Sequence, residues 1–210
     1  MMSDIEQVTQ LVLRERRSRD RGWWEEMDAC FAADSIVDMS WFNGSGAEFV
    51  RLTRQASQDG VWGRHRLSPP IVQVQEDRAW AELPLAIEFH IDVDGIEADL
   101  VSWCRSQYRF RRAAAGWAII RITSIYEHDT LGPSIPGTHL NISPADFQAS
   151  RSSYRCLAWY LRRQGKPLRE DLLGDDQPGP VTRQYEAERA WLSGVDDGRG
   201  EGEVWPMMPN

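Results

Sequence analysis

The feature that most limits the possible folds is a stretch in which apolar and polar side chains alternate. In residues 79–91, the positions of one parity are Ala81, Leu83, Leu85, Ile87, Phe89 and Ile91. The positions of the other parity are Trp80, Glu82, Pro84, Ala86, Glu88 and His90. A period of two is typical of a β-strand that turns one face toward a core. The stretch therefore predicts one long strand with an apolar face.

Further strands are predicted on both sides of this one. Residues 64–75 precede it, and residues 97–112 and 117–128 follow it. The connecting segments are short, and the one at 92–95 contains Asp and Gly, which tolerate the positive φ angles of hairpin turns. These runs together predict a long, curved antiparallel sheet.

The residues before this sheet favour helices. Ile5, Val8, Leu11 and Val12 recur at helical spacing and predict a first helix over residues 4–20. Similar patterns predict a short helix over 23–34, a strand over 35–42, a turn at 43–46 and a helix over 47–58. The order of helices followed by strands indicates an α+β domain that spans residues 1–130.

The remaining residues predict a helical C-terminal extension over 131–194. A Gly/Pro loop at 131–140 precedes a helix that begins at the cap Ser143, continues through Pro144 and ends at Gly165. A linker at 171–180 separates it from a last helix over 181–192. The extension is too small to fold alone and must dock on the first domain or on a neighbouring subunit. Residues 195–210 lack core-forming side chains and predict a disordered tail.

The charge balance argues against a nucleic-acid-binding protein. The 24 Lys and Arg face 32 Asp and Glu, so the net charge is -8, whereas phosphate binding needs a basic face. Several arginines do end the first helix, namely Arg14, Arg16, Arg17, Arg19 and Arg21. Cations at a helix C-terminus suit the helix macrodipole, so we interpret this cluster as structural.

Neither a membrane span nor a secretory signal is indicated. The apolar runs are far shorter than the about 18 residues that cross a bilayer. The first residues lack the basic and apolar regions of a signal peptide. We therefore expect a soluble, cytoplasmic protein without a membrane partner, in which the 3 cysteines are buried thiols.

The candidate chemistry is acid–base catalysis without a cofactor. The 4 histidines have no metal-site spacing, and the chain contains neither a Cys-x-x-Cys pair nor a Gly-rich phosphate loop nor a Gly-x-Ser-x-Gly motif. We therefore expect no metal and no cofactor. A histidine oriented by a carboxylate can move protons near neutral pH. Asp20, at the end of the first helix, and His65, at the start of a strand, offer such a pair, although a surface imidazole between Arg64 and Arg66 is an equally simple interpretation.

The order of elements resembles that of the SnoaL-like branch of the NTF2-like superfamily. The similar segments are Arg21-Gly22-Trp23-Trp24, residues 31–38, Gly63-Arg64-His65, residues 75–81 and residues 116–121. The resemblance covers most of the first 125 residues. It implies a cone-shaped fold in which a curved sheet surrounds a deep apolar pocket.

Within that superfamily the chain is most similar to scytalone dehydratase, bile acid 7α-dehydratase and hexachlorocyclohexane dehydrochlorinase. The resemblance implies a catalytic dyad of Asp20 and His65. It also implies a second catalytic histidine at His90 and a leaving-group arginine at Arg121. Scytalone dehydratase has a tyrosine immediately before its catalytic aspartate, where this chain has Arg19, so that water-holding arrangement is not reproduced.

Other aromatic residues are candidates for substrate binding. Tyr108 and Tyr126 lie on predicted strands and can supply a phenol, but alternation alone does not say which of them points inward. The tryptophans that can line a pocket for a flat ligand are Trp24, Trp41, Trp62 and Trp103, and core packing explains them equally well.

The resemblance implies a lyase that removes water or halide from a small, apolar, cyclic substrate. The same dyad can instead move a proton within one molecule, as in a ketosteroid-isomerase-like double-bond isomerase. A non-catalytic ligand-binding or assembly protein of the same fold is a third alternative. The related dehydratases imply a homo-oligomer, a trimer rather than a dimer. The C-terminal helices then cover the pocket or contact another subunit.

Overall fold

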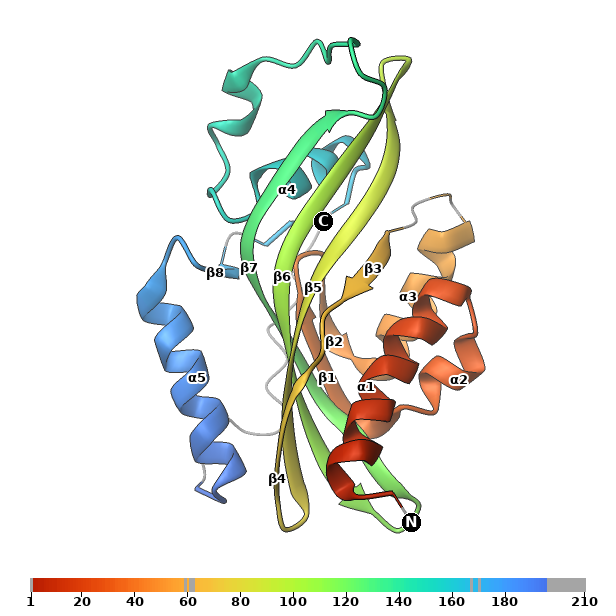
Figure 1. Ribbon diagram of the computed structural model, residues 1–210, viewed down its shortest axis with the longest axis vertical. Coiled ribbons are helices and arrows are strands. Elements are labelled where there is room, and N and C mark those ends of the chain that lie inside the picture. Colours follow the sequence, from red (N-terminus) through yellow and green to blue (C-terminus); the bar gives the residue numbers. More distant parts are fainter. Residues whose placement is uncertain (1, 59, 61–62, 167, 170, 196–210) are drawn as a thin grey trace.

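The computed structural model describes residues 2–58, 60, 63–166, 168–169 and 171–195 (Figure 1). Trp62 and, apart from Val195, the predicted tail at 195–210 lie outside these residues. Within the described ranges, no helix combines the length and the apolar character that crossing a membrane requires.

The described residues form one eight-stranded sheet in the order β2-β1-β7-β6-β5-β3, with β4 beside β5 and β8 beside β7. Its long antiparallel centre consists of β5 (Arg78–Val93), β6 (Ile96–Ala113) and β7 (Gly116–Pro133). The shorter strands are β1 (Phe31–Met39), β2 (Phe42–Ser45), β3 (Arg64–Leu67), β4 (Ile71–Gln75) and β8 (Leu173–Gly174). The predicted α+β class with a curved sheet is therefore confirmed.

Three details of the predicted strands are wrong. Residues 64–75 form two strands rather than one, because Pro69 and Pro70 lack the N–H groups that a strand ladder needs. The segment at 43–46 is not a turn: Ser45 pairs with Ile36 in β2, and the chain reverses at residues 40–41 instead. β1 also begins earlier than predicted and pairs in parallel with β7, so the sheet is mixed.

Three helices cover one face of this sheet, as Figure 1 shows: α1 (Asp4–Arg21), α2 (Trp24–Asp28) and α3 (Gly46–Gln58). Ser3 begins α1, because its side chain accepts the Glu6 N–H while the Glu6 carboxylate accepts the Ser3 N–H. Gly22 ends it in the left-handed conformation at φ 71°. The buried face of α1 extends to Ser18, near its C-terminal end. Asp20 lies at this end, next to β3.

The C-terminal extension docks on the first domain of the same chain. Ser143 caps only a short 3-10 helix, η1 (Pro144–Phe147), and α4 (Arg155–Arg163) begins later than predicted. The serine-rich segment between them is a poor helix former, and the Asp129 carboxylate accepts the Leu157 N–H at 2.7 Å in the first turn of α4. α4 packs against β6 and β7, whereas α5 (Pro178–Leu192) lies on the opposite side of the sheet from α1 (Figure 1).

Candidate active site

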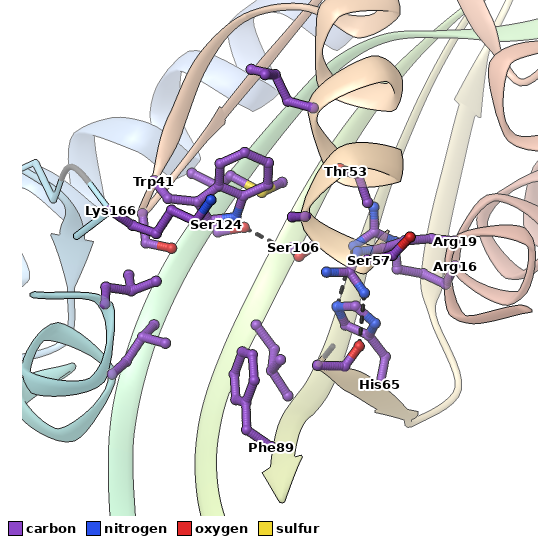
Figure 2. Close-up of a pocket in the computed structure, with 18 of the residues that line it drawn as sticks. Arg16, Arg19, Trp41, Thr53, Ser57, His65, Phe89, Ser106, Ser124 and Lys166 are labelled. Carbon is purple, nitrogen blue, oxygen red and sulfur yellow. Dashed lines mark hydrogen bonds between the residues drawn. The ribbon is translucent and has the colours of Figure 1, made fainter. Parts of the chain in front are cut away.

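A cavity of about 370 Å³ lies between the helices and the sheet (Figure 2). Its apolar walls come from α3, β5 and α4, through Leu52, Leu85, Ile87, Phe89, Leu157 and Leu161. The volume lies within the range that small-molecule sites usually have. The strand face predicted to be apolar therefore forms part of the wall of a ligand-sized cavity.

His65 and Asp20 meet at one side of this cavity. The pairing of β3 with β5 places His65 opposite Ile87, so the imidazole points toward the cavity side of the sheet. His65 Nδ1 lies 2.7 Å from Asp20 Oδ1, and the His65 backbone N–H donates to Asp20 Oδ2 at 2.7 Å. An ionised carboxylate accepts only, so Nδ1 carries the proton and Nε2 is left with a lone pair. The His65 side chain is 3% exposed.

The environment keeps this imidazole neutral. Burial, together with the positive charges of Arg19 and Arg16, lowers the pKa of His65 to about 3, against the opposing effect of Asp20. For Asp20, burial alone would raise the pKa, but the hydrogen bonds and charge of the His65 group and the charge of Arg19 lower it to about 2. The pair at neutral pH is thus an aspartate and a neutral histidine whose Nε2 is a hydrogen-bond acceptor.

Two arginines of α1 lie beside the dyad. Arg16 forms a two-pronged ion pair with the neighbouring Glu15, and both side chains are buried. Its remaining nitrogen, Nη1, lies 3.5 Å from His65 Nε2. Arg19 Nη1 donates to the Gly63 carbonyl at 2.8 Å and lies 3.3 Å from Asp20 Oδ1. Figure 2 shows both guanidinium groups close to the His65 ring.

Contrary to what the sequence alone indicated, the arginines that end α1 do not all serve only the helix macrodipole. Arg16 and Arg19 line the cavity instead, whereas Arg17 is exposed and pairs with Glu26. A usable signal was present in the sequence. The spacing of the buried residues Val8, Leu11 and Val12 continues, at intervals of three and four, through Glu15, Arg16 and Arg19.

The first part of the chain is similar to a known family of domains. Residues 1–123 match the SnoaL-like domain family. The chain belongs to the SnoaL-like family. The match covers more than half of the chain and includes both dyad residues. The C-terminal extension, with α4 and α5, lies beyond the matched residues of this SnoaL-like chain.

The SnoaL-like chain is also similar to individual proteins. An uncharacterized protein of Emericella nidulans is 26% identical over 193 residues, 85% of this chain and 81% of that protein. A crystal structure of an NTF2-like protein with a cystatin-like fold, from Novosphingobium aromaticivorans, is 23% identical, with a TM-score of 0.46, over 68% of this chain and 85% of that one. A structure of a protein of unknown function from Mycobacterium tuberculosis is 15% identical, with a TM-score of 0.51, over 79% of this chain and 98% of that one. The SnoaL-like family and the α+β fold expected from the sequence are confirmed.

Some of the other predicted site residues of the SnoaL-like chain reach the cavity. Tyr126 and Trp24 line it, as does Trp41. The Tyr126 hydroxyl accepts the Ser40 N–H at 2.9 Å. Tyr108 does not line the cavity: it is fully buried under α1, where its hydroxyl donates to Glu15 at 3.4 Å.

Three predicted site residues lie on the outer face of the sheet, and their predicted roles at the cavity need correction. His90 follows Phe89, which faces the cavity, so alternation turns the imidazole outward, where it is 63% exposed and lies 2.9 Å from Asp99. Arg121 pairs in register with Arg109, beside α5. Trp103 stacks on His128 at 4.4 Å between ring centroids. None of the three lines the cavity.

The buried dyad predicts an acid-sensitive fold. The unfolded chain binds a proton on His65 below pH 6.5, whereas the folded chain does so only near pH 3. The unfolded state therefore binds more protons in this window, and the free energy of unfolding falls as the pH falls. Protonation of Asp20 lowers the free energy of unfolding further, between pH 3.8 and about pH 2. For His65 the expected loss is about 2 kcal/mol between pH 7 and pH 5.

Urea unfolding at both pH values checks this expectation. His65→Gln removes the titrating group and flattens the dependence, whereas the exposed His90→Gln leaves it steep. Equal slopes in the wild type and His65→Gln would contradict the assignment.

Proposed function

We propose that this SnoaL-like protein is a cofactor-independent lyase that removes water or halide from a small, apolar, cyclic substrate. One observation carries the proposal. His65 lies on the wall of an apolar cavity, with its Nδ1–H held by Asp20 and Nε2 left as the proton acceptor. A base that is positioned by a carboxylate in a largely apolar cavity suits abstraction of a proton from carbon.

The reaction follows from this arrangement. His65 Nε2 takes a proton from the carbon next to a carbonyl group, and Asp20 stabilises the imidazolium that forms. The electrons of the broken C–H bond form the new double bond as the hydroxyl or halide leaves the neighbouring carbon. In a dehydration the imidazolium returns its proton to the leaving hydroxyl, which departs as water. In a dehydrohalogenation the halide departs as the anion, and the proton passes to solvent.

Two alternatives use the same cavity. If the imidazolium returns its proton to another carbon of the substrate, the product is a double-bond isomer. If no proton moves, the protein binds a small ligand without chemistry. Incubation with cyclic β-hydroxy ketones, β-halo ketones and β,γ-unsaturated ketones, followed by NMR, separates these outcomes. Loss of water or halide supports the lyase, and a shifted double bond supports the isomerase.

The variant Asp20→Asn tests the dyad in any assay that shows turnover. An amide can donate to Nδ1, which moves the ring proton to Nε2 and removes the base. We expect kcat to fall on the order of 10³-fold with little change in KM. The chain offers a matched control in Asp99, which is also bound to a histidine but on the outer face. Asp99→Asn is expected to retain full activity. Unchanged kcat in Asp20→Asn would reject the Asp20–His65 pair as the catalytic base.

A further inference from the structure

We propose that Arg16 binds the negative oxygen that develops on the substrate beside His65, so that the substrates are ring compounds that form an enolate or an acidic phenol. This inference rests on the proposed function and names the substrate class of the same site. It is carried by the charges that face the cavity and by the way in which Arg16 is held.

The ionised side chains that line the cavity in the described part of the chain are all cations: Arg16, Arg19 and Lys166. Glu15 and Asp20, the nearest carboxylates, stand behind the arginines and do not line it. Arg16 and Arg19 are ion-paired with these carboxylates, but the N–H groups that reach the cavity belong to the cationic partners. Such charged donors favour an anionic oxygen over a neutral or cationic ligand.

Arg16 is already held in place before any substrate binds. Nε and Nη2 of the guanidinium each donate a hydrogen bond to a carboxylate oxygen of Glu15. The Tyr108 hydroxyl donates to the same carboxylate at 3.4 Å and helps to fix it. Only 3% of Arg16 is exposed, so the group does not reorient into solvent. A donor of this kind stabilises developing charge without a cost of reorganisation at the moment of reaction.

The remaining nitrogen of Arg16 lies beside His65 Nε2, the atom that would take the proton. Nη1 lies 3.5 Å from His65 Nε2. A carbonyl oxygen that accepts from Nη1 at about 2.9 Å brings the adjacent carbon next to Nε2. As Nε2 takes the proton from that carbon, the carbonyl becomes an enolate whose oxygen faces the guanidinium. The bond to Arg16 is then stronger in the transition state than in the bound substrate, which is the condition for catalysis.

Arg16 also contributes, after burial and the charge of Arg19, to the weak basicity of the His65 imidazole. The guanidinium disfavours a positive charge on His65 while the cavity is empty. Once the substrate oxygen carries negative charge, it offsets the positive charge of the Arg16 guanidinium. Protonation of the neighbouring His65 imidazole is then less unfavourable. Binding of an enolate-like anion is therefore expected to be coupled to proton uptake by His65.

A binding experiment tests this role without any turnover. The probe is 4-nitrophenol, whose phenolate absorbs visible light, and 4-nitroanisole is its neutral isostere. We expect the wild type to bind the phenolate at least tenfold more tightly than the isostere, and to take up a proton from solution on binding. The paired substitution Glu15→Gln with Arg16→Met removes both buried charges together and is expected to abolish this preference.

Two further variants keep the test decisive. Arg17→Gln removes a cation from the same helix on the solvent side and is expected to bind the phenolate like the wild type. Arg16→Lys keeps the charge but not the two-pronged geometry, and is expected to weaken phenolate binding several-fold. This variant still tests the role of Arg16 if the paired variant does not fold. A wild type that binds both probes equally, or a folded paired variant that keeps the preference, would overturn the proposal.

Failure of this inference and failure of the lyase proposal can be told apart. If the phenolate preference is found but no elimination is detected, Arg16 is an anion-binding residue in a ligand carrier, and the lyase is rejected. If elimination is detected without phenolate preference, the lyase stands and the role of Arg16 is rejected.

Discussion

Replacement of His65 by Gln is expected to lower kcat for elimination by on the order of 10³-fold, because a glutamine amide cannot take a proton from carbon. Gln can still donate to Asp20 in place of Nδ1–H, so the cavity wall and the Arg19 contact to Gly63 are preserved. KM is therefore expected to change little, since the walls that bind the apolar part of the substrate are intact. Steady-state kinetics of purified, folded protein measures both quantities.

His90→Gln is the matched control for this prediction. It removes the other aspartate-bound histidine of the sheet, which lies on the outer face and away from the cavity. Its kcat and KM are expected to equal those of the wild type. An equal loss in both variants would contradict the assignment of the catalytic base to the cavity histidine.

The second prediction with a large expected effect concerns α5, which packs on the outer face of the sheet. Arg109 of β6 donates to Glu188 of α5 at 2.8 Å, and both side chains are buried. The Arg109 guanidinium also lies over the Trp191 ring, 5.0 Å from its centroid. Arg109→Met leaves the Glu188 carboxylate buried without this cation, and Gln184, which donates to it at 2.6 Å, carries no charge. The free energy of unfolding is expected to fall by about 3–5 kcal/mol.

The paired variant, Arg109→Met with Glu188→Met, is the control. Removal of both charges leaves no ion to desolvate, so the paired variant is expected to be at least 2 kcal/mol more stable than Arg109→Met alone, as is roughly typical of buried pairs. Urea unfolding of the wild type, both single variants and the pair gives the coupling energy. A single variant as stable as the wild type would show that α5 is not held by this ion pair.

The buried pair also shows how the extension is joined to the SnoaL-like domain. Its two helices lie on different faces: α4 contributes Leu157 and Leu161 to the cavity wall, whereas α5 packs against the outer face through polar and aromatic side chains. The sequence left open whether these helices cover the pocket or contact another subunit. In the folded chain α4 borders the cavity and α5 packs on the sheet; contact with another subunit stays a prediction.

Much of the fold could be predicted because its signals are local. The alternation in residues 79–91 indicates β5, and the spacing of Val8, Leu11 and Val12 indicates α1, since each pattern depends only on neighbours along the chain. The strand pairing of β1 with β7 was not predictable in this way, because it joins segments about 85 residues apart through backbone hydrogen bonds that no side-chain pattern records.

For the candidate site, too, some features could be predicted from the sequence and others could not. The sequence by itself determined the α+β class, the family resemblance, and the pairing of Asp20 with His65 as the residues to consider. Only the tertiary structure decided which face of β5 lines the cavity, and so excluded His90, and which arginines of α1 face Nε2 rather than water. The physical reason is that burial and electrostatic environment are properties of space: Arg16 and Arg17 are neighbours in sequence, but only the packing of α1 on the sheet places one guanidinium in the cavity and the other in solvent.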